Sequence, residues 1–190
     1  MNTTGIMIVG VGGQGSLLAS KLLGNLLMAE GFDVKVSEVH GMSQRGGSVV
    51  TYVRFGEKVY SPIIEEGEAD YVLSFEKLEA ARWARCLKVG GKMIVNTQQI
   101  DPMPVLIGKA DYPEDVLAEL AQKGVDIDAV DALDIATKAG SAKAVNIVLL
   151  ARLAKELGIP KEKWLTAIET TVKPRFVDLN KTAFEMSYQK

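Results

Sequence analysis

The sequence predicts an α/β protein: a Rossmann-like open, mostly parallel sheet with helices on both faces, followed by a helical C-terminal third. Two observations predict this class. Over residues 5–130, apolar runs of strand length alternate with segments of helical periodicity, as in the strand–helix units of parallel sheets. Beyond residue 131 the periodicity is almost entirely helical. The length of 190 residues suits one such fold, and we expect a single domain over residues 1–190.

The expected strands are short apolar or β-branched runs bounded by glycine or charged residues. They lie at residues 5–9, 33–39, 48–55, 71–74, 92–95 and 125–130. The turn Gly56-Glu57, followed by residues 58–60, predicts a β-hairpin. Residues 13–30 and 75–87 have helical periodicity, so we expect a helix at each.

The second half of the chain is predicted to be mostly helical. Residues 98–112 contain prolines and no clear period, which indicates an irregular excursion from the sheet. Pro113 predicts the start of a helix with Glu114 and Asp115 in its first turn, where the helix dipole favours acids. We expect further helices at residues 131–139, 143–157, 161–172 and 177–188.

The helices expected at residues 13–30 and 143–157 are unusually apolar. Their aliphatic side chains extend around most of the circumference, whereas a surface helix needs an apolar stripe of only about 100°. One interpretation puts each helix at the centre of the fold, covered by the C-terminal helices. The other makes one face of each helix a subunit interface. Both can hold on different faces.

The composition argues against several classes of function. With 22 basic and 24 acidic residues the net charge is -2, which disfavours non-specific binding to nucleic acid or to an anionic membrane. No apolar run is long enough to span a bilayer and no basic–apolar leader is visible, so we expect a cytoplasmic protein. The single cysteine, Cys86, and the single histidine, His40, are too few for an iron–sulfur cluster or a zinc site. Any redox centre would belong to a cofactor or to another chain.

The most informative motif is the glycine-rich segment after the first strand. Gly10, Gly12 and Gly15 stand at G-x-G-x-x-G spacing, with Gly13 and Gln14 between the last two. The first glycine of such a motif allows a tight turn, the second lets a phosphate approach the backbone, and the third lets the helix pack closely on the strand. The N-terminus of the following helix favours an anion. The motif predicts a site for a phosphate-bearing cofactor and does not by itself specify NAD.

A second motif lies in the loop after the second strand, at the sheet edge where α/β proteins bind ligands. Arg45 offers a planar set of donors suited to phosphate or carboxylate, and Gly46 and Gly47 let the backbone approach a ligand or another chain. We predict that these three residues complete the cofactor site begun by residues 10–15. In the alternative, Arg45 pairs with a nearby acid and the glycines only form a turn.

Four other side chains have a structural as well as a functional interpretation. Glu38 follows the glycine motif by about 20 residues, where an acid can bind an NAD ribose, but it can equally be a solvent-facing acid. His40 can titrate near neutrality, yet no obvious Ser, Cys or Asp constellation accompanies it, which favours a role in loop structure. Lys143 could neutralise a phosphate or be solvated, and Cys86 is expected to be an ordinary, partly buried thiol. No residue emerges as a catalytic acid, base or nucleophile.

With both motifs present, the chain resembles the gamma-type domain of the 2-oxoacid:ferredoxin oxidoreductases. The resemblance rests on residues 10–15, residues 41–47 and Arg54 in the next strand. The sequence Gly-Met-Ser-Gln-Arg-Gly-Gly at 41–47 is most similar to the beta subunit of the indolepyruvate:ferredoxin oxidoreductases. An apolar helix opened by Asn146 and a C-terminal helix containing Asn180 are also similar to the family. The resemblance covers nearly the whole chain.

This resemblance implies a subunit of a multi-subunit enzyme. The family decarboxylates a 2-oxoacid on thiamine diphosphate, passes electrons through iron–sulfur clusters to ferredoxin and releases an acyl-CoA. In the indolepyruvate branch the thiamine diphosphate and the clusters are on the large alpha subunit, which is therefore the expected partner, with ferredoxin reached through the complex. Relatives of this domain help to bind coenzyme A, so the resemblance suggests CoA for residues 10–15 and 45–47, and an arylpyruvate such as indolepyruvate as the substrate of the whole enzyme.

Two other functions stay open at this point. A stand-alone NAD-dependent oxidoreductase would bind NAD with the glycine motif and Glu38. A purely structural assembly subunit would leave the glycine turn without a ligand. The family resemblance predicts that the isolated chain is inactive, and the sequence leaves open whether it forms a homodimer.

Overall fold

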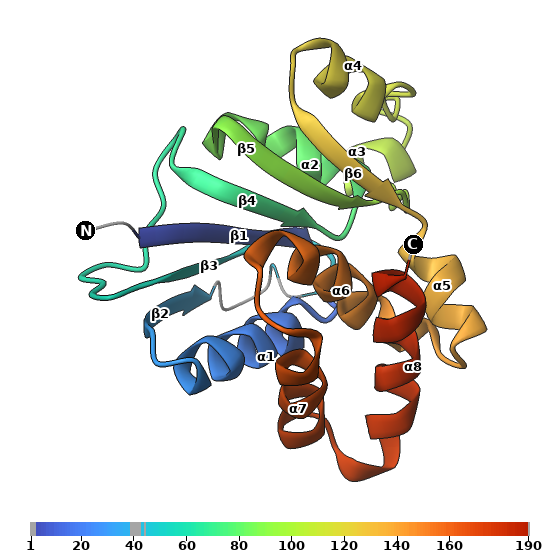
Figure 1. The fold of residues 1–190 in the computed structure, drawn as a ribbon. Coiled ribbons are helices and arrows are strands. Elements are labelled where there is room, and N and C mark those ends of the chain that lie inside the picture. The colour runs from blue at the N-terminus through green and yellow to red at the C-terminus, as the bar shows by residue number, and fades with distance from the viewer. Residues whose placement is uncertain (1–2, 39–42, 44, 190) are drawn as a thin grey trace.

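The computed structural model describes residues 3–38, 43 and 45–189, and in this part of the chain six strands form one sheet in the order β2-β3-β1-β4-β5-β6 (Figure 1). The strands are β1 Thr3–Val11, β2 Asp33–Glu38, β3 Ser48–Gly56, β4 Ala69–Ser74, β5 Leu87–Asn96 and β6 Asp126–Val130. β1, β4, β5 and β6 are parallel, whereas β3 runs antiparallel to both of its neighbours, β1 and β2. The predicted Rossmann-like, mostly parallel α/β class is confirmed, with one antiparallel strand inside the sheet.

Helices cover both faces of this sheet. They are α1 Ser16–Ala29, α2 Lys77–Trp83, α3 Met103–Leu106, α4 Val116–Gln122, α5 Ala132–Lys138, α6 Val145–Leu157, α7 Lys161–Thr171 and α8 Val177–Tyr188. α1, α5, α6, α7 and α8 lie on one face, and α2 and α4 on the other (Figure 1). The alternation of side chains along β1 explains this division, because Ile6 and Ile8 point into the first layer and Met7 and Val9 into the second.

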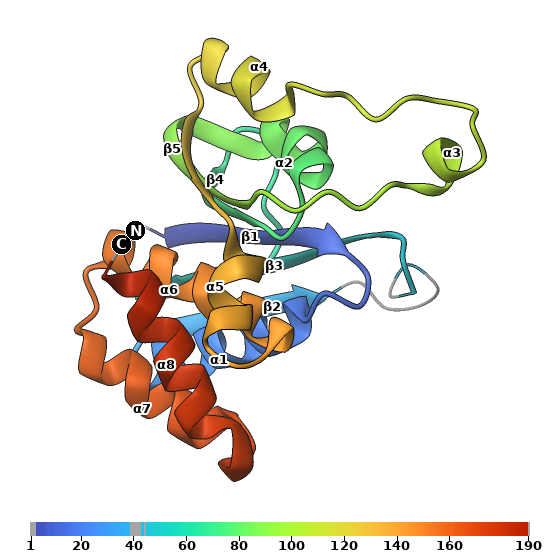
Figure 2. The ribbon, with the colours of Figure 1, turned by 90° about the vertical axis from the view of Figure 1, so that its right-hand side faces the viewer.

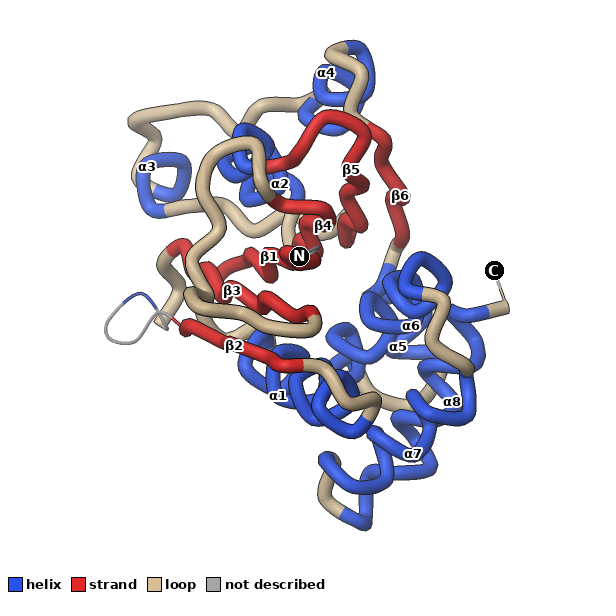
Figure 3. The backbone as a smooth tube through the Cα atoms, turned by 60° about the vertical axis from the view of Figure 1, so that its left-hand side comes forward, coloured by secondary structure: helices blue, strands red, loops and turns tan. Residues whose placement is uncertain are grey.

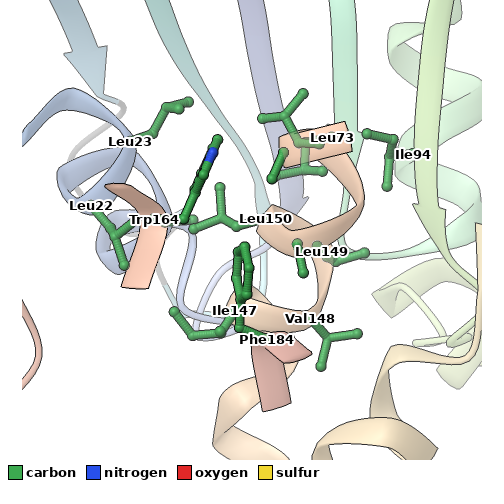
Figure 4. Close-up of a cluster of buried hydrophobic side chains, with 14 of the residues drawn as sticks. Leu22, Leu23, Leu73, Ile94, Ile147, Val148, Leu149, Leu150, Trp164 and Phe184 are labelled. Atoms are coloured by element: carbon green, nitrogen blue, oxygen red, sulfur yellow. The ribbon is translucent and has the colours of Figure 1, made fainter. Parts of the chain in front are cut away.

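Helix α6 forms the centre of the larger core. Its residues Ile147, Val148, Leu149 and Leu150 are fully buried between the sheet and the neighbouring helices. In Figure 4 they meet the aromatic side chains of α7 and α8, together with leucines of α1. The interpretation that this apolar helix is internal to the fold is therefore confirmed.

Helix α1 supports both interpretations of its apolar character on different faces. Leu22, Leu23 and Leu27 are fully buried in the core, as an internal helix requires. On the opposite face, the side chains of Leu17 and Met28 are 44% and 56% exposed. The subunit-interface interpretation stays a prediction for that outer face.

The predicted β-hairpin at residues 56–60 is wrong. β3 ends at Gly56, and no strand follows at residues 58–60. Both edges of β3 are already paired, one with β1 and one with β2, so no free strand edge is left for a hairpin partner. Val59 is buried instead, and its backbone N–H donates to the carboxylate of Asp33 over 2.9 Å.

Several helix boundaries differ from the expected ones. The helix expected from Pro113 begins three residues later, at Val116, with Asp115 as its N-cap, so Glu114 lies before the helix rather than in its first turn. The helix expected at residues 75–87 is α2 followed by a 3-10 turn at Ala84–Cys86. A second 3-10 turn, Ala142–Ala144, forms the start expected for α6.

The expected excursion after β5 is present and prominent. Between β5 and α4 the chain leaves the sheet in a long loop that carries the short helix α3 away from the body of the molecule (Figure 2). β2 and β6 form the two edges of the sheet (Figure 3). Among the described residues, no helix is both long enough and apolar enough to cross a bilayer.

The parallel strands β1 and β4 approach each other closely where β1 ends. The N–H of Phe75 donates to the carbonyl of Val9 over 2.9 Å. A Cβ atom on Gly10 would lie only 2.9 Å from the Cβ of Phe75 and equally close to the Oε1 of Gln14. Gly10 therefore allows β1 and β4 to close around the side chain of Gln14.

Two leucines test whether α6 is the structural centre. We expect Leu149→Ala to lower the free energy of unfolding by about 2–5 kcal/mol, because it leaves a cavity in a fully buried site. Leu106→Ala in α3 removes the same atoms from a side chain that is 66% exposed, and we expect a change within about 0.5 kcal/mol. Urea denaturation of both variants measures the difference. Equal losses would contradict the central role of α6.

Two glycine-to-alanine variants test the close approach at Gly10. Gly10→Ala places a methyl group against Phe75 and is expected to destabilise the protein by about 1–3 kcal/mol. Gly24→Ala is the matched control, because its Cβ would meet Val36 at an ordinary 3.7 Å inside α1. We expect Gly24→Ala to be stabilising by about 0.5–1 kcal/mol through helix propensity. Thermal unfolding followed by circular dichroism distinguishes them, and a neutral Gly10→Ala would show that the contact relaxes freely.

Candidate functional site

The glycine motif forms a tight turn between the end of β1 and the start of α1. The N–H of Gln14 donates to the carbonyl of Val11 over 3.2 Å, which closes the turn. Gly15 is the N-cap of α1 and has a left-handed backbone with φ of 90°. A Cβ on Gly15 would also lie 3.3 Å from the Nδ2 of Asn146, so this position is constrained both by its backbone and by α6. The last glycine was predicted to let the helix pack closely on the strand, and the close neighbour that the structure shows for it is instead Asn146 of α6.

The side chain of Gln14 is bound within the protein. Its Oε1 accepts the N–H of Val11 over 2.8 Å, and its Nε2 donates to the carbonyl of Phe75 over 3.0 Å and to the Oε1 of Gln98 over 3.4 Å. Gln14 was predicted as a cofactor-binding residue, and the structure shows its amide holding the turn in place. Ligand contact by this side chain stays a prediction.

The described part of the Arg45 loop is a second tight turn. The N–H of Gly47 donates to the carbonyl of Ser43 over 3.0 Å, and Gly46 has a left-handed backbone with φ of 92°. A Cβ on Gly47 would lie 3.0 Å from the Cα of Ser43, so glycine is required for this closeness. The side chain of Arg45 is exposed. His40 and the other positions of residues 39–42 and 44 lie outside the described residues.

The fold brings these two turns into direct contact. The N–H of Gly12 donates to the carbonyl of Gly47 over 2.8 Å. The contact exists because β3 begins at Ser48, opposite Val11 at the end of β1. The sequence placed both motifs at one sheet edge, and the structure shows that their backbones are hydrogen-bonded.

Two cavities flank the glycine turn. The first has a volume of about 330 Å³ and lies between the turn, the start of α1 and β3. It is lined by Gly12, Gly13, Gly15, Ser16, Leu17, Val49 and Thr51. The second has a volume of about 460 Å³ and lies between the turn, the loop after β5 and the start of α6. Its lining includes Gly13, Gln14, Gly15, Gln98, Lys143 and Asn146.

The predicted site residues occupy different positions relative to these cavities. Gly12, Gly13, Gln14 and Gly15 line one or both of them, whereas Gly10 is buried behind the turn. Arg45 and Gly46 are exposed on the neighbouring loop and line neither cavity. Gly47 joins that loop to the turn through Gly12.

The surroundings of the second cavity favour an anion. The N-termini of α1 and α6 meet at the turn, where Gly15 contacts Asn146, and each helix dipole contributes positive potential at this end. Lys143 is exposed and lines the cavity. This position is compatible with both of its interpretations, a cation that neutralises a phosphate and a solvated side chain, and the first stays a prediction.

Behind the site lies a buried polar cluster that the sequence did not reveal. Glu76, the N-cap of α2, is buried, and its carboxylate accepts the hydroxyl of Tyr112 and the N–H groups of Ile100 and Glu79. Burial and the hydrogen bond to Glu76 raise the pKa of Tyr112 well above its usual value. One signal in the sequence could have indicated Glu76 as a helix cap: it is an acid between an apolar strand and the helix that follows.

A second buried acid, Glu79, contacts the first strand residue after the Arg45 loop. The hydroxyl of Ser48 donates to the carboxylate of Glu79, which is 4% exposed. Burial raises the pKa of Glu79, and the hydrogen bond from Ser48 and the charge of Arg82, 3.6 Å away, oppose this shift. Sequence reasoning missed Glu79 because its partner is 31 residues away in the chain.

The positions of Glu38 and Cys86 in the fold largely decide between their structural and functional interpretations. Glu38 accepts a hydrogen bond from the hydroxyl of Ser20 over 2.6 Å, and β3 separates β2 from β1 and its glycine turn. In a dinucleotide site the acid follows the strand next to the one that carries the glycines. Cys86 is buried, and burial raises the pKa of its thiol, which makes it an unreactive core residue.

Comparison with known proteins agrees with this architecture. The family model described as pyruvate ferredoxin/flavodoxin oxidoreductase matches residues 5–190. The indolepyruvate oxidoreductase subunit IorB of Thermococcus kodakarensis is 43% identical, over 98% of this chain and 95% of the relative.

Two solved structures share the fold. The gamma subunit of a keto/oxoacid ferredoxin oxidoreductase from Geobacter sulfurreducens aligns with a TM-score of 0.72 at 24% identity, over 98% of this chain and 96% of that one. A 2-oxoglutarate:ferredoxin oxidoreductase from Magnetococcus marinus, with 2-oxoglutarate, coenzyme A and succinyl-CoA bound, aligns over all of this chain and 32% of its own, with a TM-score of 0.76 at 16% identity. The chain therefore belongs to the pyruvate ferredoxin/flavodoxin oxidoreductase family.

Proposed function

We propose that this chain is the small subunit of an indolepyruvate-type 2-oxoacid:ferredoxin oxidoreductase. The enzyme would convert an arylpyruvate and CoA into an acyl-CoA and CO2 while reducing ferredoxin. Curated relatives at 37–43% identity carry the name indolepyruvate oxidoreductase subunit, and the match extends over nearly the full length of both chains. One cysteine cannot supply the thiolates of an iron–sulfur cluster, which supports placing the clusters and the thiamine diphosphate on a large partner subunit.

Within that enzyme, we propose that the glycine turn and the Arg45 loop hold part of CoA. The observation that carries this proposal is the hydrogen bond from Gly12 to Gly47, which joins the two predicted motifs into one surface. Gly13 lines both cavities, and a Cβ placed on it meets no atom within 4 Å, so its backbone is open to a ligand. The relative of known structure that contains CoA has the same fold.

The residues present fit a diphosphate joined to an apolar chain. The two cavities have volumes of about 330 and 460 Å³, within the range of small-molecule sites. Lys143 and Arg45 provide positive charge on opposite sides of the turn, and two helix N-termini add to it. Leu18, Leu133 and Val145 give the larger cavity an apolar wall.

The chain's own part in the reaction would be to bind and orient. CoA supplies the thiol that takes up the acyl group. Arg45 and Lys143 would hold phosphate oxygens, and the backbone at Gly13 and Gly15 would let the diphosphate come close. Gln14 would keep the turn in shape through its bonds to Val11 and Phe75.

Other features of the proposal follow from the family. We place the subunit in the cytoplasm, acting as one domain over residues 1–190, with ferredoxin as the acceptor reached through the complex. The exposed outer face of α1, with Leu17 and Met28, is where a homodimer of the isolated chain would form. The NAD-dependent alternative is disfavoured because Glu38 is bonded to Ser20 and separated from the turn by β3.

The isolated chain should have no activity of its own. We expect no reduction of ferredoxin when it is mixed with indolepyruvate and CoA, and activity after co-expression and co-purification with the large subunit. The absorbance change of ferredoxin measures turnover. As a control, titration calorimetry measures the binding of NAD to the isolated wild-type chain and to Glu38→Ala. Saturable binding of NAD that Glu38→Ala weakens would favour the dehydrogenase alternative.

Arg45→Ala tests the proposed CoA site. Loss of a charge-assisted hydrogen bond to phosphate, of about 1.5–3 kcal/mol, would raise the KM for CoA about 10- to 100-fold and leave the KM for indolepyruvate unchanged. Steady-state kinetics of the purified alpha–beta complex give both constants. Arg85→Ala is the matched control, because Arg85 is exposed in the 3-10 turn before β5, at the opposite end of the sheet.

The outcome also separates CoA binding from a purely structural role. If Arg45→Ala and Gly12→Val leave the KM for CoA at the wild-type value in an intact complex, the chain is an assembly subunit without a ligand. If Arg85→Ala raises the KM for CoA as much as Arg45→Ala does, the effect comes from the net charge of the protein rather than from a binding site.

A further inference from the structure

Among the residues that the structure describes, two acids are buried, Glu76 and Glu79, and only Glu76 is a helix cap. Glu79 lies within α2, and its side chain is 5% exposed. Its backbone N–H donates to the carboxylate of Glu76, which is the N-cap of the helix. Burying a carboxylate is unfavourable unless hydrogen bonds compensate for lost water. Glu79 forms an ion pair with Arg82 of its own helix over 3.6 Å, and it accepts a hydrogen bond from Ser48, outside that helix.

Ser48 connects this acid to the candidate site. It directly follows Gly47, which accepts the N–H of Gly12 over 2.8 Å and donates its own N–H to Ser43 over 3.0 Å. Gly47 and Ser48, at the end of the loop, are therefore joined to the glycine turn on one side and to α2 on the other. The backbone of Ser48 is paired with Val11 in the β1–β3 ladder, so its side-chain hydrogen bond to Glu79 is an additional anchor for the end of the loop.

Helix α2 is itself a rigid reference for this loop. Glu76 fixes its start through Tyr112 and Ile100 in the excursion after β5. Phe75, one residue earlier, accepts hydrogen bonds from Gln14 over 3.0 Å and from Asn96 over 3.1 Å. The same buried cluster thus holds the glycine turn and the helix that carries Glu79.

We propose that Glu79 is a positioning residue, which through Ser48 sets the placement of the Arg45 loop against the glycine turn. The inference rests on the proposed CoA site. Glu79 lies behind the loop and lines neither of the two cavities beside the glycine turn. Its effect on CoA is therefore indirect, through the backbone of residues 45–48.

The test uses the alpha–beta complex and steady-state kinetics with CoA. Glu79→Leu and Ser48→Ala each remove the side-chain hydrogen bond, and we expect each to raise the KM for CoA about 3- to 10-fold with kcat within a factor of two. Glu79→Gln keeps an acceptor for Ser48 and should stay within a factor of two of the wild-type KM. The double variant should be no worse than the poorer single variant, because both remove the same contact.

Hydrogen exchange of the complex gives a second readout that a general loss of stability would not reproduce. We expect faster exchange in peptides covering residues 10–15 and 43–48 of Ser48→Ala, with unchanged exchange over residues 3–9 of β1. Ser61→Ala is the matched control, because it removes a hydroxyl that accepts the N–H of Ile63 in the chain after β3, away from Ser48 and from the Glu76 cluster. It should leave the KM for CoA and the exchange at residues 43–48 unchanged.

The results distinguish this inference from the proposed function. If Arg45→Ala raises the KM for CoA while Ser48→Ala and Glu79→Leu do not, the CoA site stands and the positioning role is wrong. If none of the three variants changes the KM for CoA, both the CoA site and the positioning role are wrong. If Glu79→Leu does not assemble with the large subunit, Ser48→Ala alone decides, since it removes only one hydroxyl.

Discussion

The side-chain amide of Gln14 is the interaction on which the candidate site depends. It joins the N–H of Val11 at the end of β1 to the carbonyl of Phe75 just after β4, and it reaches Gln98 after β5. Three neighbouring parallel strands are thereby tied together at their carboxyl ends. Gly10 is a glycine because a Cβ there would collide with this amide and with Phe75. The turn is rigid because its polar groups are satisfied inside the protein.

The antiparallel strand β3 explains why the Arg45 loop belongs to the same site. In a strictly parallel sheet, a strand next to β1 would start at the amino end of β1, far from the glycine turn. Because β3 runs the other way, its first residue, Ser48, lies opposite Val11. The loop that precedes β3 then arrives at the carboxyl edge, where Gly47 meets Gly12. One reversal of strand direction thus turns two separate motifs into neighbours.

The sequence predicted the features that depend on local pattern. Apolar runs and helical periods located all six strands and the internal helix α6, because burial imposes a period on the residues of each element. It predicted a mostly parallel sheet but not the strand order or the antiparallel direction of β3, and the hairpin at residues 56–60 failed for that reason: both edges of β3 were already occupied. The contacts of Glu76 with Tyr112 and of Glu79 with Ser48 span 36 and 31 residues, and no local pattern encodes such pairs.

The division between buried and exposed polar groups gives the site its character. The carboxylates and amides that shape it, those of Gln14, Glu76 and Glu79, are buried or half-buried and bonded within the protein, and the cations Arg45 and Lys143 lie at the exposed surface. A glycine turn whose hydrogen bonds are already satisfied needs little reorganisation when a ligand binds. The attraction between the cations and the ligand is then not reduced by the cost of ordering the turn. Exposed cations in water bind an anion weakly, and their attraction strengthens when a second surface excludes the solvent. A large subunit covering this edge would provide that surface, which is the physical reason to expect strong CoA binding by the complex and weak binding by the chain alone.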